Sequence, residues 1–345
     1  AALYEANHAG WEFSEPYKQS LRRMIEAVPS LTDAGGNLPR YGDGDDGRGV
    51  QLQAAQDRRD AWLFDFARVL LDASVPHAAE PSLAARIAGF DQIPEKEWNP
   101  PAGGKAFEDA GLYELASNRG TDKEMFVMFD AGPQGYLSQA AHGHADALSV
   151  TLNVGGRPVL VDPGTFCYHA EPEWRNYFRG TRAHNTVTVD GQDQAVPGGM
   201  FMWRTKADAR VLERNPYQQE IIAVHDGYLH LRTGVVHQRK IALQGNRLEL
   251  ADELRGTGEH ELEWRFHFAP ECGAALNGGV CEVAWEGGSM KVHLDPAIEW
   301  TLVRGGSQAG WFSPAFGVRR ETFTLCGRLR KALPVFAATI CEISE

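Results

Sequence analysis

The stretch that decides the fold is "HGHADALSVTLNVGGRPVLVDPGT", residues 142–165. Apolar and polar residues alternate on both sides of Gly155-Gly156, a pair typical of a tight turn between antiparallel strands. We therefore predict a β-hairpin here. Both ends of the stretch are polar, because two histidines and Asp146 open it and Asp162 follows the second apolar run.

The same pattern continues through the rest of the chain. Short runs rich in Val, Ile, Thr and Leu recur between turn residues, as in "EIIAVHDGY" (220–228), "VVHQRKIALQ" (235–244) and "NRLELADEL" (246–254). About a dozen such runs, with a second turn signal at Gly245-Asn246, predict a large antiparallel β-sandwich over residues 106–345.

The first 92 residues have a different character. Apolar residues recur at three- and four-residue spacing over 14–28, 50–74 and 80–90, which predicts helices. Between the first two lies "LPRYGDGDDGRG" (38–49), which we interpret as a solvated connection because it lacks the spacing and closing Glu of a calcium loop. The Pro- and Gly-rich residues 93–105 predict a linker.

Composition excludes several classes of protein. The formal net charge of −12 argues against nucleic-acid binding, and no apolar run approaches the ~20 residues needed for membrane insertion. Five single cysteines form no CxxC pair, which argues for free thiols and against a zinc ribbon. Motifs for nucleotide binding, serine hydrolysis and zincin-type proteolysis are also missing from the sequence.

The polar ends of the hairpin suggest a metal site. If the strand begins near His142, then His142, His144 and Asp146 share one face, and the turn brings Asp162 back toward them. His184 also precedes a predicted strand, in "RGTRAHNTVTVDG" (179–191). A His, Asp and His set with a fourth position for water or another ligand suits Zn²⁺. Spacing alone leaves open the alternative of ordinary hydrogen-bonded polar residues.

Longer segments carry a family resemblance. Residues 142–168, "RNYFRGTRAHNTVTVDGQDQ" (175–194) and "VVHQRKI" (235–241) resemble the heparinase II/III-like polysaccharide lyases, which include heparin lyases and alginate or oligoalginate lyases. The resemblance covers roughly residues 4–343. It implies a mainly β fold, a supersandwich-like antiparallel β-sandwich preceded by the last helices of an (α/α) toroid, which residues 1–92 would form. An upstream toroid domain is then expected.

The resemblance also implies residue roles. It makes His144, Asp162 and His184 ligands of one structural zinc ion, and His142 a catalytic or substrate-contacting residue. The implied reaction is β-elimination at a uronate, in which a base removes the C5 proton, the carboxylate is neutralised and an acid protonates O4. The family's principal catalytic Tyr, with an Asn or His partner, lies in the toroid, well upstream of "GDGDDGR".

Further candidates lie near His184 in the sequence. We expect Tyr177 to be catalytic, and we expect four residues to bind substrate: Arg175, Arg179, Arg182 and Tyr168. For the arginines the alternatives are solvated charge and structural pairing, and for Tyr177 the alternative is packing. Structural hydrogen bonding is the expected role of a last group: His225, Asp226, His237, Arg239 and His267.

The expected function is that of a polysaccharide lyase acting on uronic-acid glycans such as heparan sulfate-like, alginate-like or other acidic polysaccharides. The alternative is a non-catalytic, metal-stabilised carbohydrate-binding or structural β-sandwich. Hydrolysis by paired carboxylates has less support, because no acidic pair stands out in the segment. From the family resemblance alone we expect a bacterial protein that is periplasmic or secreted.

Overall fold

The computed structural model describes residues 2–44, 61–76, 80–99, 103–307 and 309–344. The chain forms two compact units, one of residues 1–38 and 47–102, the other of residues 39–46 and 103–345. Residues 50–60 of the second predicted helix and 100–102 of the predicted linker lie outside the described residues. Within the described part, no helix is long and apolar enough to cross a membrane.

The first unit is helical, as predicted. Its elements are α1 (Ala2–His8), α2 (Glu15–Ala27), the 3₁₀ helix η1 (Val28–Leu31), α3 (Ala61–Leu71) and α4 (Leu83–Ile87). Pro16 stands in the first turn of α2, where its missing N–H costs nothing, and the Ser82 hydroxyl caps α4 by accepting from the Ala85 N–H at 3.3 Å. Leu3, Phe64 and Leu71 lie in its small core.

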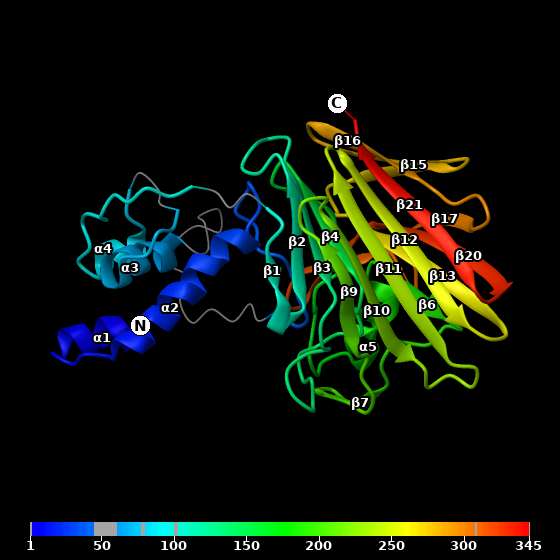
Figure 1. Cartoon of the computed structure of the whole chain (residues 1–345), viewed down its shortest axis with the longest axis horizontal. Helices are drawn as coiled ribbons and strands as arrows, with labels where there is room; N and C mark the ends of the chain where they lie inside the picture. Colours follow the sequence, from blue (N-terminus) through cyan, green and yellow to red (C-terminus); the bar gives the residue numbers. More distant parts are fainter. Residues whose placement is uncertain (1, 45–60, 77–79, 100–102, 308, 345) are drawn as a thin grey trace. The chain divides into compact units, whose positions relative to one another are not determined.

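The second unit consists mainly of antiparallel strands (Figure 1). The strands are β1 (Ala106–Phe107), β2 (Leu112–Ser117), β3 (Met125–Asp130), β4 (Val150–Val154), β5 (Arg157–Leu160), β6 (Val187–Val189), β7 (Pro197–Gly199), β8 (Met202–Trp203), β9 (Ala209–Asn215), β10 (Glu220–Tyr228), β11 (Val235–Gln244), β12 (Arg247–Gly256), β13 (Glu259–His267), β14 (Gly273–Asn277), β15 (Val280–Trp285), β16 (Gly288–His293), β17 (Glu299–Arg304), β18 (Trp311–Ala315), β19 (Val318–Glu321), β20 (Phe323–Ala332) and β21 (Val335–Ile343). The helices of this unit are η2 (Glu108–Ala110), α5 (Pro172–Arg179) and η3 (Thr181–Ala183).

The three larger sheets form a sandwich. One sheet has the order β1-β2-β3-β4-β5, the second β14-β15-β16-β21-β12-β11-β10-β9 and the third β17-β20-β13-β6. A β-bridge between Leu160 and Phe268 joins the five-stranded sheet to the four-stranded one. Side chains from all three sheets share one apolar core, with Leu152, Leu250 and Trp264 among its fully buried members. The predicted antiparallel sandwich is therefore confirmed.

The hairpin that opened the sequence argument is also confirmed, but its first strand is shorter than expected. Gly155 and Gly156 have φ values of 55° and 75°, as a type I′ turn requires. β4 begins only at Val150, and residues 142–149 form a loop. The prediction that the side chains of His142, His144 and Asp146 share one face of a strand is therefore wrong. Leu148, at φ 59°, interrupts any extended path into the strand.

Candidate functional site

The candidate site lies in the second unit, where three loops meet. They precede β4, follow β5 and precede β6. The buried side chain of Asn185 joins them, because its Nδ2 donates to the carbonyls of Val150 at 2.7 Å and Val161 at 3.0 Å. The backbone N–H of Asn185 donates to the Ser149 hydroxyl at 3.1 Å. One amide thus fixes the positions of all three loops.

A buried ion pair supports the same loops from β11 and β12. Arg239 Nη1 donates to the carbonyls of Leu148 at 2.8 Å and Asn185 at 2.7 Å. Its Nε and Nη2 bind the two carboxylate oxygens of Asp252 at 2.7 and 2.9 Å. Burial alone would raise the pKa of Asp252, but Arg239 and His237 hold this pKa below its usual range. The structural role expected of Arg239 is confirmed.

The other expected structural histidines are hydrogen-bonded inside the sandwich. Nε2 of His225 lies 3.1 Å from Nδ1 of His237, whose Nε2 donates to Asp252 at 2.7 Å. His267 donates from Nε2 to the Arg182 carbonyl at 3.2 Å and accepts from the Thr324 hydroxyl at 3.0 Å. Burial, assisted by nearby positive charge, lowers the pKa of His267 to about 3. All three histidines therefore serve the fold as neutral groups. Asp226, on the exposed side of β10, accepts from the Asp208 N–H at 2.8 Å.

The three predicted metal ligands come together, and a fourth side chain joins them. One potential ligand atom from each of His144, Asp146, Asp162 and His184 lies within 4.8 Å of the others, and all four residues are buried. His184 Nε2 lies 3.2 Å from Nδ1 of His144 and 3.3 Å from Oδ2 of Asp162. Zinc bonds of 2.0–2.1 Å in a tetrahedron place neighbouring ligand atoms about 3.3 Å apart. The two separations at His184 match this spacing, so the cluster could hold a metal ion.

The outward hydrogen bonds of the two histidines fix which ring nitrogens face inward. His184 Nδ1 donates to the Gly180 carbonyl at 2.8 Å, and His144 Nε2 donates to Asp43 at 3.0 Å. In neutral rings the inward nitrogens then carry lone pairs, which point toward each other across 3.2 Å. That arrangement fits a cation between them. A proton on His184 is the alternative, since Asp162 raises the pKa of His184 against the effect of burial.

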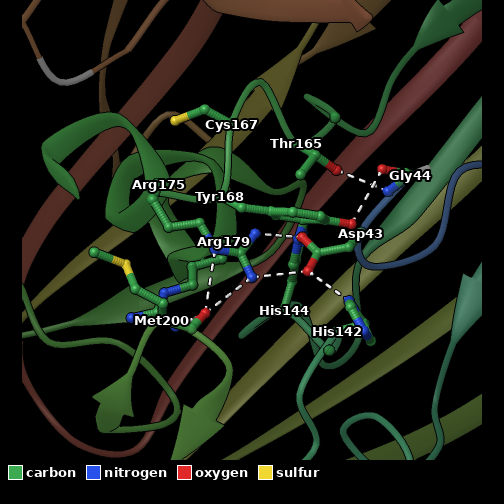
Figure 2. A network of polar contacts seen from close by, with 12 residues as sticks. Asp43, Gly44, His142, His144, Thr165, Cys167, Tyr168, Arg175, Arg179 and Met200 are labelled. Atoms are coloured by element: carbon green, nitrogen blue, oxygen red, sulfur yellow. Dashed lines mark hydrogen bonds and ion pairs between the residues drawn. The ribbon is translucent and has the colours of Figure 1, made fainter. Parts of the chain in front are cut away.

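Asp43 is the site residue that sequence reasoning missed. It lies in the loop we interpreted as a solvated connection, yet its carboxylate is buried and accepts from Nδ1 of His142 at 3.1 Å and Nε2 of His144 at 3.0 Å (Figure 2). Arg175 binds both carboxylate oxygens, with Nη2 at 2.8 Å from Oδ2. Burial acts to raise the pKa of Asp43, but these partners lower it to about 2. The interpretation of this residue as solvated is therefore wrong.

The segment that delivers Asp43, residues 39–44, is called the strap below. The Asp43 N–H donates to the His142 carbonyl at 2.8 Å, and the Gly44 N–H donates to the Thr165 hydroxyl at 2.8 Å. Gly42 has φ +59°, and a Cβ added there would stand 2.4 Å from the His142 carbonyl oxygen. Only glycine fits this approach. Gly42, directly before Asp43, was the one sequence signal of a close contact.

His142 lies next to the cluster and faces solvent. Its side chain is 64% exposed, and its Nδ1 hydrogen bond to Asp43 directs Nε2 away from that carboxylate (Figure 2). The rings of Phe201 and Tyr168 stand 5.5 and 6.0 Å away. His142 therefore presents an oriented, accessible nitrogen that can accept or donate a proton.

The predicted substrate-binding arginines are mostly engaged inside the protein. Arg175 is fully buried against Asp43, and Arg179 donates to the Gly199 carbonyl at 2.7 Å and to the Asn176 side chain at 2.8 Å. We therefore revise the role of both from substrate contact to structural pairing, because a buried, hydrogen-bonded guanidinium cannot reach a glycan. Arg182 binds Glu263 at 3.1 Å while its side chain stays 30% exposed.

The two predicted tyrosines have different surroundings. The Tyr177 ring, on α5, packs against Trp174 and Phe178 with centroids 5.5 and 5.0 Å apart, and burial raises its pKa. The Tyr168 ring lies over the Arg175 guanidinium at 5.3 Å, and its hydroxyl is 3.5 Å from the Gly44 carbonyl. Their catalytic and substrate-binding roles stay predictions.

Comparison with known proteins shows the family of the chain. The sequence profile of the family described as "Heparinase II/III-like, C-terminal" matches residues 99–338, well over half of the chain. The chain belongs to the heparinase II/III-like family. The match covers His142, all three predicted metal ligands and Asp146, whereas Asp43 precedes it.

Two curated relatives of this chain are named heparin-sulfate lyase. The chain is 28% identical over 230 residues to that of Pedobacter heparinus and 22% identical over 237 residues to that of Bacteroides stercoris. The matches cover 63% and 66% of this chain, but the chain spans only about a third of the length of either relative, 31% and 32%. The crystal structure of heparan sulfate lyase HepC from Pedobacter heparinus shares the fold, with a TM-score of 0.71 at 19% identity, covering 100% of this chain and 50% of that one.

Proposed function

We propose that this protein cleaves a uronic-acid-containing glycan by β-elimination, with heparan sulfate as the first candidate substrate. Membership of the heparinase II/III-like family and the names of the two curated relatives support the reaction class and the substrate. The observation that carries the proposal is His142, an exposed imidazole that a buried carboxylate orients beside a candidate metal centre.

The geometry of His142 suits the proton transfers of an elimination. Neutral His142 carries its proton on Nδ1, facing Asp43, so Nε2 is available to accept a proton. Protonated His142 donates from Nε2, either to the uronate carboxylate or to the departing O4. In both cases Asp43 stabilises the imidazolium. Because Arg175 binds Asp43 in turn, the carboxylate keeps its place through the reaction.

We propose zinc as the ion of the cluster, held by His144, Asp162 and His184. It would join the three loops and so supply structural stability to the site. Two imidazoles among the donors favour zinc over calcium or magnesium, which prefer oxygen ligands.

Other residues are expected to complete the reaction. Tyr168 lies beside His142, and Arg182 keeps a partly exposed positive charge for an acidic glycan. The tyrosine that the family resemblance places in a toroid is expected to share the proton transfers with His142. Tyr177 remains a further candidate.

The test is an ultraviolet assay of the full-length gene product. β-Elimination leaves an unsaturated uronate that absorbs in the ultraviolet, so heparan sulfate, alginate and hyaluronan are each incubated with the protein. Rising absorbance, greatest with heparan sulfate, is the expected result. Binding of the glycans without absorbance on any of them would favour a carbohydrate-binding module. Reducing ends that appear without absorbance would indicate hydrolysis.

A further inference from the structure

We propose that Asp146 is a fourth protein ligand, which closes the coordination sphere of the metal. The inference rests on the zinc centre proposed above. A His, Asp, His set alone leaves one tetrahedral position for water or substrate, as in catalytic zinc sites. With Asp146 in that position, the ion has no open site and serves structure alone.

The loop before β4 is what places Asp146 in the cluster. In an extended strand, alternate residues stand about 6.6 Å apart. Here the chain turns instead, with the Ser149 N–H donating to the Asp146 carbonyl at 2.9 Å, and the Ala145 N–H donating to the Arg179 carbonyl at 2.9 Å. The Asp146 side chain points inward and is only 6% exposed, with a carboxylate oxygen inside the 4.8 Å cluster.

Charge balance favours the same assignment. A divalent ion bound by two neutral imidazoles and Asp162 alone would leave one net positive charge buried, and an uncompensated buried charge is costly. The carboxylate of Asp146 cancels that charge. Asp43 cannot do so, because its negative charge is already paired with Arg175. The four-ligand site is therefore neutral as a whole.

Water is the competing occupant of the fourth position. A small cavity of about 30 Å³ lies against the cluster, and Asp130, Asp146 and Asp162 are among its lining residues. A cavity of this size can hold a water molecule. The two possibilities differ in one measurable respect: a bound water exchanges for an added anion, whereas a protein carboxylate does not.

The first experiment measures metal affinity. The 345-residue chain is stripped with a chelator and titrated with Zn²⁺ against a competing chelator, as wild type, Asp146→Asn and Asp130→Asn. Loss of a direct ligand should weaken zinc binding by more than the ~10–100-fold typical of an outer partner. The matched control Asp130→Asn, which changes another carboxyl of the same cavity, should alter the affinity by only a few-fold. Circular dichroism of the metal-free forms checks folding.

The second experiment needs no variant, so it decides the question even if Asp146→Asn fails to fold. Cobalt is substituted for zinc and azide is added while the visible spectrum is recorded. A closed site predicts no change in the wild type. A spectral shift in the wild type, or equal zinc affinity in Asp146→Asn, would overturn the inference and leave the zinc centre standing. A wild type that binds no zinc would overturn both. Failure of the ultraviolet assay alone would overturn only the lyase activity.

Discussion

Asp43 and His144 lie 101 positions apart in the sequence, yet Oδ1 of Asp43 accepts a hydrogen bond from Nε2 of His144 at 3.0 Å. A carboxylate behind a metal-ligating histidine fixes the ring and raises the basicity of its inward nitrogen. The same carboxylate also orients the exposed ring of His142. The strap therefore links the candidate metal centre to the candidate catalytic group.

Replacing Asp43 by Asn should weaken metal binding, although Asp43 is not itself a proposed ligand. We expect zinc affinity to fall by about 10–100-fold, as for other partners of metal-bound histidines. The variant also leaves Arg175 buried without its charge partner, which should cost about 3 kcal/mol or more in the free energy of unfolding. Zinc competition titration and urea denaturation measure the two effects. Asp208→Asn, at an exposed position, is the control, and equal values for both variants would contradict the role of Asp43.

The fit of the strap can be tested at Gly42. Gly42→Ala and Gly245→Ala both introduce a Cβ at nearly the same φ, +59° and +60°, but only the first meets a neighbour, the His142 carbonyl oxygen at 2.4 Å. Left-handed strain should cost each variant about 1–2 kcal/mol. We expect Gly42→Ala to lose zinc affinity in addition, because Asp43 is displaced. Retention of wild-type zinc affinity in Gly42→Ala would show that the fit of Gly42 is not needed to hold Asp43 against His144.

The buried pair behind the site should matter greatly for stability. Arg239→Met leaves Asp252 buried with its main charge partner removed, so we expect the free energy of unfolding to fall by about 3–5 kcal/mol. Arg255→Met, which breaks the surface pair with Glu253, should cost less than about 1 kcal/mol. Urea denaturation at pH 7 compares the two. Similar losses in both would mean that Arg239 does not hold the loops.

Acid should destabilise the sandwich through its buried histidines. The pKa of His267 is about 3 in the folded chain, chiefly through burial, against about 6.5 when unfolded. Between these values the unfolded chain binds a proton that the folded chain excludes, so stability falls as pH falls below 6.5, by up to about 1.4 kcal/mol per pH unit for this group. Urea denaturation from pH 7 to 5 should show a shallower slope for His267→Gln than for wild type. His293→Gln, at a half-exposed position, should keep the wild-type slope; equal slopes for all three would refute the assignment.

The fold was predictable because its signals are local. The glycine pair at 155–156 and the alternating runs over 220–254 formed the hairpin and the strands β10, β11 and β12 as expected. The start of β4 was not predictable, because Leu148 adopts a left-handed conformation held by tertiary contacts, including the bond from Arg239 to its carbonyl.

The candidate site was predictable only in part. Positions next to predicted strands made His144, Asp162 and His184 candidates, and the family resemblance made them the expected ligands. Their side chains meet as expected. Asp43 was missed, since its loop has the composition of a solvated turn and its partners lie about 100 positions away. Arg175 was expected to bind substrate because of its charge, but its guanidinium forms an ion pair with Asp43. The sequence alone did not reveal this pair.

The most direct test of the central claim is the initial rate of ultraviolet absorbance on heparan sulfate for the wild-type full-length protein and its His142→Ala variant. The account predicts a drop in kcat of about 10²–10⁴-fold, the usual contribution of a proton-transferring side chain, with zinc content and Tm unchanged. An undiminished rate in His142→Ala, with the protein folded and loaded, would contradict it.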